Sequence, residues 1–154
     1  MSDLVIRPDD LSSAPTRELL TLHLSGMQAN SPEGHVFALD LSGLQVPEVT
    51  VWSAWDGQAI AGIGALKELG DGSGEIKSMR THPDHLRKGV GAAILERIIQ
   101  EARARGLSRL SLETGSGAAF EAALAMYRKR GFRSGGAFSD YQASAFNQFM
   151  HLDL

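Results

Sequence analysis

The sequence predicts a single α/β domain over residues 1–154, with one mixed sheet of the α+β type and helices packed on it. The first observation is a run of three strand-like segments separated by turn sequences, at 48–55, 58–69 and 75–81. The second is an alternation of helical periods with strand-like segments, at 89–105, 108–114, 118–130 and 146–154. An antiparallel meander followed by β–α–β–α–β is the order expected of a mixed sheet covered by helices.

The N-terminal part predicts a short strand, a helix and an irregular segment. Leu-Val-Ile-Arg at 4–7 is strand-like and is ended by Pro8. Four leucines within 16–27 favour a helix, for which Thr16 is the predicted N-cap. Residues 30–45 predict a loop followed by a short helix.

Turn and cap residues delimit the remaining elements. Asp-Gly at 56–57 is a hairpin turn signal, and the glycine-rich stretch at 70–74 predicts the next turn. Apolar side chains recur every four residues from Val90 to Ala102, as on the buried face of a helix. Gly106 is placed to end that helix as a C′ glycine.

Composition excludes several classes of protein. The chain has no cysteine, so disulfides, cysteine zinc sites and thiol catalysis are absent. Its net charge of −3 is opposite in sign to that of a typical nucleic-acid binder. No window approaches the roughly 20 apolar residues of a membrane span, and the start does not resemble a signal peptide. A cytoplasmic protein that binds neither nucleic acid nor membrane is the simplest prediction.

A glycine-rich, basic stretch stands where a predicted helix begins. It reads Leu-Arg-Lys-Gly-Val-Gly-Ala at 86–92, with Arg87 and Lys88 directly before Gly89 and Gly91. The first turn of a helix has unpaired N–H groups and a partial positive charge, and glycine lets a ligand approach them. The stretch is therefore typical of a phosphate or pyrophosphate site, although an ordinary loop-to-helix junction also tolerates glycine.

Neither of two common phosphate-binding sequences fits this stretch fully. The P-loop sequence G-x-x-x-x-G-K-[ST] does not occur in the chain. The dinucleotide fingerprint G-x-G-x-x-G would need glycine instead of Ile94, and its first glycine should directly follow a strand, whereas 82–88 intervene. Glu113 stands about twenty residues further on, as in that fold, so an NAD-binding oxidoreductase stays open as the lesser alternative.

The stretch at 86–92 and a second one at 126–132 together resemble the GCN5-related N-acetyltransferase (GNAT) superfamily. The segments at 25–44, 112–120 and 137–150 resemble a bacterial subgroup of that family. In that family [RQ]-x-x-G-x-[GA] follows an antiparallel strand and opens a helix, and a later helix ends in Y-x-x-x-G-[FY]. The chain has LRKGVGA and MYRKRGF in this order, so the resemblance covers nearly its whole length. Leu86 stands where the family has Arg or Gln. The resemblance implies the GNAT fold, in which strands 75–81 and 108–114 are parallel neighbours that splay apart.

The family resemblance also implies acetyl-CoA as the co-substrate and no metal. The pantetheine arm would bind the backbone of strand 75–81 near Met79 and Thr81, and the thioester would enter the gap between the splayed strands. The pyrophosphate would lie on the backbone amides of the helix start, at Arg87, Lys88, Gly89, Val90, Gly91 and Ala92.

Acetyl transfer to an amine requires a neutral amine, a polarised carbonyl and a stabilised thiolate, and it needs no covalent nucleophile. Tyr127 matches the family position whose phenol acts as general acid to the CoA sulfur, although it also shares an apolar helix face. Glu75 matches a position where the histone-acetyltransferase branch has a catalytic base. Glu113, at the end of the neighbouring strand, is a candidate for binding or deprotonating the substrate. His23 and His35 lie in the N-terminal segment that forms the acceptor site in this family.

The sequence thus predicts an acetyl-CoA-dependent N-acetyltransferase that acts on a small-molecule or peptide amine. Acidic residues predominate in 1–75 and basic residues in 76–154, which favours a cationic acceptor such as a polyamine, an aminosugar or lysine. A CoA-binding module without catalytic activity is the principal alternative. A homodimer paired through the terminal strand 146–154 is left open.

Overall fold

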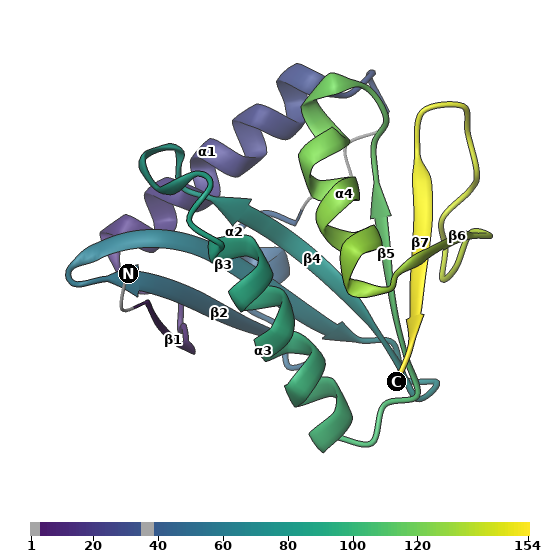
Figure 1. The fold of residues 1–154 in the computed structure, drawn as a ribbon, viewed down its shortest axis with the longest axis horizontal. Helices are drawn as coiled ribbons and strands as arrows, with labels where there is room; N and C mark the ends of the chain where they lie inside the picture. The colour runs from purple at the N-terminus through teal and green to yellow at the C-terminus, as the bar shows by residue number, and fades with distance from the viewer. Residues whose placement is uncertain (1–3, 35–38) are drawn as a thin grey trace.

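The computed structural model describes residues 4–34 and 39–154, which form a seven-stranded sheet with helices on both faces (Figure 1). The strands are β1 (Val5–Pro8), β2 (Val49–Asp56), β3 (Ala59–Glu68), β4 (Ser73–Thr81), β5 (Arg109–Thr114), β6 (Arg133–Gly135) and β7 (Gln148–Asp153). The helices are α1 (Ala14–Asn30), α2 (Leu41–Leu44), α3 (Val90–Ala104) and α4 (Glu121–Arg130), with 3-10 turns η1 (Pro83–His85) and η2 (Ala118–Phe120).

The order of strands across the sheet is β1-β2-β3-β4-β5-β7-β6. All neighbouring pairs are antiparallel except β4 and β5, which are parallel. The parallel pair is joined by the crossover through α3, whereas tight turns join the antiparallel strands of the meander. The predicted mixed sheet is therefore confirmed, and its one parallel pair lies at its centre.

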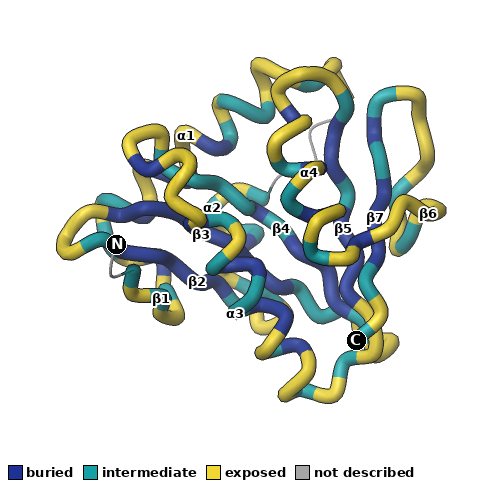
Figure 2. Tube along the Cα trace, viewed as in Figure 1, coloured by how far each residue is buried: buried dark blue, intermediate teal, exposed yellow. Residues whose placement is uncertain are grey.

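Two apolar cores cover the two faces of the sheet. α3 and α4 pack on one face, with Ile94 and Leu124 in the same cluster as Trp52 and Ile76. α1 and α2 pack on the other face, where their leucines meet alternate residues of the same strands, such as Val51. Figure 2 shows β2, β3 and β5 buried along most of their length, β4 buried only in part, and the outer sides of the helices exposed.

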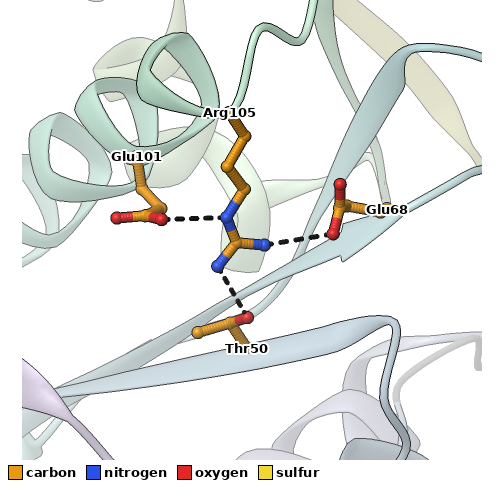
Figure 3. A network of polar contacts seen from close by, with 4 residues as sticks. All are labelled: Thr50, Glu68, Glu101 and Arg105. Carbon is orange, nitrogen blue, oxygen red and sulfur yellow. Dashed lines mark hydrogen bonds and ion pairs between the residues drawn. The ribbon is translucent and has the colours of Figure 1, made fainter.

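A polar network fixes the C-terminal end of α3 against the sheet (Figure 3). The Arg105 guanidinium donates to Glu101 at 2.9 Å, to Glu68 of β3 at 3.3 Å and to Thr50 of β2 at 2.9 Å. A cation at this end also interacts favourably with the helix dipole. The network anchors α3 at the end opposite to its glycine-rich start, and thereby helps to fix where that start lies.

The predicted N-cap of α1 is wrong by three residues. Ser13 is the N-cap, and its Oγ accepts the backbone N–H of Thr16 at 3.3 Å. Pro15 lies in the first turn, where its missing N–H costs no helical hydrogen bond, so the helix begins earlier than the leucine pattern indicates. The Thr16 hydroxyl is buried and donates to Asp9 at 2.9 Å.

The strand β6 is missing from the sequence prediction because three residues carry too little alternation to identify a strand. β6 pairs with β7, and β7 also pairs with β5. Both edges of β7 are therefore occupied within the chain at Phe149–His151, so these residues of the strand offer no free edge to a second copy. No helix in the described ranges is long and apolar enough to cross a membrane.

Candidate active site

The two central strands separate part-way along their length. β4 and β5 pair only from Ser73 to Glu75 and from Arg109 to Ser111, after which no ladder joins them. A β-bulge places Ser78 and Met79 opposite a single residue of β3, and Ser78 has a left-handed backbone with φ of 57°. The separation opens a groove of about 960 Å³, lined by α1, β4, the start of α3, β5 and α4.

The N-terminus of α3 lies at one end of this groove. Gly89 caps the helix in a left-handed conformation with φ of 76° and supplies no side-chain cap. The first helical hydrogen bond runs from Ala93 to Gly89, so the N–H groups of the three residues between them have no helical acceptor. Val90, Gly91 and Ala92 all line the groove, and their free N–H groups with the helix dipole favour an anion there.

Glycines in β3 allow the start of α3 to lie this close to the sheet. A Cβ on Gly62 would lie 2.7 Å from Val90, and one on Gly64 would lie 2.6 Å from Ile94. Any larger residue would push the helix and its free N–H groups away from β4. The basic side chains beside the helix start differ in position: Arg87 lines the groove, whereas Lys88 is absent from its lining and reaches His85 at 3.4 Å.

The edge of β4 that faces the groove is free beyond the paired segment. Met79 and Thr81 follow the bulge and line the groove. Neither residue has a partner on β5, because the ladder ends at Glu75. An extended ligand could therefore pair with this edge as a neighbouring strand would.

Tyr127 of α4 lines the wall of the groove that α4 forms. The side chain is 5% exposed and packs edge-on against Phe132 with ring centroids 5.6 Å apart. Burial raises the pKa of the Tyr127 phenol well above its usual value, so the hydroxyl keeps its proton. That hydroxyl forms no hydrogen bond with any residue in the described ranges, although it lies on a groove wall.

A buried ionic cluster lies on the α1 face of the sheet. The Lys77 ammonium donates to Glu75 at 3.1 Å and to the Tyr141 hydroxyl at 2.8 Å. The Tyr141 hydroxyl in turn donates to the same Glu75 oxygen at 2.5 Å. Sequence reasoning missed Tyr141, because it lies in an irregular segment outside both motifs and nothing local indicates its contact with β4.

Glu113 lies next to this cluster and is only half-buried. Burial, reinforced by the charge of Glu75 and opposed by that of Lys77, raises the pKa of the Glu113 carboxyl to about 7. A carboxylate with a pKa near neutrality can accept and release a proton under ordinary conditions. Glu113 also lines the groove from β5, on the side of the strand separation that faces β4.

Of the two predicted histidines, the structure describes one. His23 of α1 is 5% exposed, and its Nδ1 accepts a hydrogen bond from Arg80 at 3.0 Å. Burial, reinforced by the charge of Arg80, lowers the pKa of His23 to about 4, so its ring is neutral at physiological pH. His35 lies outside the described residues.

The acetyltransferase (GNAT) family model matches residues 16–132 of the chain. The chain belongs to the GNAT family of acetyltransferases. The uncharacterized N-acetyltransferase YsnE of Bacillus subtilis is 49% identical over 145 residues, which are 94% of this chain and 96% of YsnE. The uncharacterized N-acetyltransferase YedL of Escherichia coli is 47% identical over 149 residues, 97% and 94% of the two chains.

Solved structures show the same fold. An acetyltransferase of Bacillus subtilis in complex with CoA superposes with a TM-score of 0.74 at 19% identity and covers 99% of both chains. The GNAT fold and the resemblance identified from the motifs at 86–92 and 126–132 are therefore confirmed, and the protein is an acyltransferase of this family. Family membership sets aside the dinucleotide-binding interpretation of the glycine-rich stretch.

The GNAT groove brings together most of the residues that the sequence singled out. Its lining includes Glu75, Met79, Thr81, Arg87, Gly89, Val90, Gly91, Ala92, Glu113, Tyr127 and His23. Leu86, which replaces the usual Arg or Gln of the motif, lines its mouth and is 58% exposed. No group of three or more acidic or histidine side chains within 4–34 and 39–154 is arranged to hold a metal ion.

The neutral state of His23 has a measurable consequence for stability. The unfolded chain binds a proton at its histidines near pH 6.5, whereas folded His23 resists it until about pH 4. The stabilisation from this residue is therefore present above pH 6.5 and is lost as the pH falls toward 4, by up to about 3 kcal/mol. His23→Asn places an amide oxygen near the former Nδ1 and does not titrate.

We expect the difference in unfolding free energy between wild type and His23→Asn, measured by urea denaturation, to shrink as the pH falls from 7 to 4. A difference that stays constant over this range would show that folded His23 titrates as it does in the unfolded chain.

Proposed function

We propose that the protein transfers the acetyl group of acetyl-CoA directly to a primary amine, with Glu113 as general base and Tyr127 as hydrogen-bond donor to the departing thiolate. The observation that carries this proposal is the groove between the separated halves of β4 and β5. It runs from an uncapped helix N-terminus, past a free strand edge, to a carboxyl whose pKa is near 7.

The free N–H groups of the α3 start suit the CoA pyrophosphate, because they combine donors with a positive dipole end. The unpaired edge of β4 at Met79 and Thr81 suits the amides of the pantetheine arm, which can pair with it as an added strand. A thioester bound in this way would enter the strand separation between Glu113 and Tyr127. The fold neighbour from Bacillus subtilis that was solved with CoA supports this assignment of the co-substrate.

In the transfer step the neutral amine attacks the thioester carbon, a C–N bond forms and the C–S bond breaks. Attack makes the nitrogen acidic, and Glu113 accepts its proton. A thiol ordinarily titrates near 8.5, well below a buried phenol, so proton transfer from Tyr127 to the thiolate would be uphill. Tyr127 therefore stabilises the thiolate by donating a hydrogen bond, and the proton that leaves the amine is released through Glu113.

Two contacts favour Glu113 over Glu75 as the base. Glu75 is 3% exposed, and its carboxylate already accepts hydrogen bonds from Lys77 and Tyr141. Hydrogen bonds to the charged form make a carboxylate a poorer proton acceptor. Glu113 has no such donors within the described residues, and burial raises its pKa, an effect that the charge of Glu75 reinforces and that of Lys77 opposes. In this proposal Glu75 acts on the reaction through the pKa of Glu113.

The alternative of a CoA-binding module without catalysis makes a different prediction for the same groove. Such a module would bind CoA and acetyl-CoA alike and release no CoA when amines are added. The raised pKa of Glu113 favours an enzyme, because a module would gain nothing from a carboxyl that titrates near neutrality.

The co-substrate site can be tested by filling it. Gly89→Trp places bulk at the start of α3, where a Cβ has open space around it, so we expect acetyl-CoA binding to be lost in calorimetry while the fold persists. Gly106→Trp is a matched control at the other end of α3, because Gly106 has the same φ of 76° and equally open surroundings. Equal affinities in the two variants would place the phosphate site elsewhere.

The role of Tyr127 can be tested with Tyr127→Phe, which keeps the ring and its packing against Phe132. We expect kcat to fall by roughly tenfold or more, as for loss of one donor to a developing charge, with acetyl-CoA affinity unchanged. The measurement is thiol release under saturating acetyl-CoA. Unchanged turnover would remove Tyr127 from the mechanism.

The role of Glu113 can be tested through pH. Because only the ionised carboxylate accepts a proton, the slope of log kcat/KM against pH should fall by about one unit near pH 7 in the wild type. With Glu113→Gln we expect kcat to drop roughly 100-fold or more and this change of slope to vanish. The slope that remains reports the protonation of the amine itself. A change of slope near pH 7 that survives in Glu113→Gln would assign the base to another group.

A further inference from the structure

Arg80 is a half-buried cation that pairs with no carboxylate of the residues that the structure describes. Its Nε donates to Nδ1 of His23 at 3.0 Å, and its Nη2 lies 3.4 Å from the His23 carbonyl oxygen. It forms no ion pair with any Asp or Glu in the described parts of the chain. The residue lines the groove on the α1 face, the face that also carries Lys77 and Glu113.

The surroundings of Arg80 hold its guanidinium in place. A Cβ on Gly26 of α1 would lie 2.8 Å from Nη2 and 3.4 Å from Cζ, so a larger residue there would make the guanidinium shift from its present place against this helix. Glycine inside a helix costs about 1 kcal/mol relative to alanine. His23 is kept neutral by burial and therefore accepts a hydrogen bond from Arg80 without competing for its charge.

One edge of the guanidinium remains available. The two contacts to His23 use Nε and Nη2, and Nη1 donates to no acceptor within the described ranges. The terminal edge formed by Nη1 and Nη2 presents two parallel N–H groups, the geometry that binds a carboxylate through two hydrogen bonds. A cation buried in this way is stabilised when an anion completes its coordination.

We propose that Arg80 binds the carboxylate of the acetyl acceptor, so that the acceptor is an amino acid or a similarly compact amine that carries a carboxylate. This inference rests on the proposed function, because it assigns the acceptor of the same groove. It also places His23 and Gly26 as positioning residues that orient the guanidinium.

The register of the strands sets the size of such an acceptor. Glu75 is level with Ser111, so Lys77 is level with Glu113 across the separation. Arg80 follows Lys77 by three residues that include the bulge, a distance of about 7–10 Å along the strand. Glu113 and Arg80 line the same groove from these two nearby strand positions, which suits an acceptor whose amine and carboxylate lie close together.

The charges of the site favour a carboxylate over other partners. A phosphate monoester carries nearly two charges and is best bound by several cations, but the nearby Lys77 already pairs with Glu75. A polyamine would bring a second positive charge toward Arg80. The excess of acidic residues in 1–75 does not decide the charge of the acceptor, because the acceptor meets the charges that line the groove.

The test compares acceptors that differ only in the carboxylate. Wild type with acetyl-CoA is assayed for thiol release with a panel of L-amino acids, the corresponding amino acid amides, phosphoethanolamine and a diamine. We expect the amino acids to give the highest kcat/KM. Amides used as well as their acids, or a preference for phosphoethanolamine or the diamine, would overturn the assignment of Arg80 to a carboxylate.

Three variants connect the preference to Arg80. Arg80→Gln keeps a donor for His23 but removes the charge and the fork, and we expect KM for the amino acid to rise about tenfold to a hundredfold, with KM for its amide unchanged. Arg80→Lys restores the charge without the fork and should recover part of the loss. Arg103→Gln removes an exposed cation of α3 and is the control. Reduced acetyl-CoA affinity in Arg80→Gln would assign the residue to the co-substrate instead and overturn the proposal.

Gly26→Ala tests the positioning without changing any charge. The added methyl displaces the guanidinium, so KM for the amino acid should rise while kcat changes little and the thermal midpoint does not fall, because alanine favours the helix. An unchanged KM would overturn the assignment of Gly26 as a positioning residue.

Failure of this inference is distinguishable from failure of the proposed function. Amino acid binding to the CoA-loaded protein is measured by calorimetry, independently of turnover. Binding that is lost in Arg80→Gln, without thiol release from any amine, would support the carboxylate site and refute catalysis. Equal transfer to amines with and without a carboxylate would support catalysis and refute the carboxylate site.

Discussion

The site depends on one constraint, the loss of hydrogen bonding between β4 and β5 beyond Glu75 and Ser111. Backbone groups at this edge need partners, and a ligand that pairs with the strand can supply them. The bulge at Ser78 supports the separation by turning β4, at the cost of a left-handed residue whose buried hydroxyl has no partner in the described ranges. Strain of this kind persists only where the surrounding packing determines it, here between β3 and α3.

The site also depends on how the buried charge of Glu75 is compensated. Glu75 is almost fully buried, and a charge at such a position is tolerated only when donors complete its coordination. Lys77 and Tyr141 supply them from β4 and from the connection before β7. Burial raises the pKa of the Glu113 carboxyl, and the cluster acts on that pKa in both directions, because the charge of Lys77 lowers it and the charge of Glu75 raises it.

The sequence predicted the parts of the site that are local. The helix start at Gly89 and the helix that carries Tyr127 were identified because each is specified by a short motif and a periodic pattern. The contacts of Arg80 with His23 and of Tyr141 with Glu75 could not be predicted, because they join residues 57 and 66 positions apart. The N-cap of α1 was misplaced for the opposite reason, since a proline in the first turn outweighed the leucine pattern on which the prediction relied.

Gly26, in the C-terminal part of α1, takes part in a long-range contact that its local sequence does not indicate. Considered alone, Gly26 is a weak point in a helix. In the fold it is the position at which β4 brings a guanidinium against that helix, and no residue with a Cβ fits without displacing it. A helix that retains this cost, next to a neutral histidine and a cation without a carboxylate partner in the described chain, is organised around an anion that the protein itself does not provide. In the acceptor site that we propose, specificity would therefore depend on α1 as much as on the motifs that identify the family.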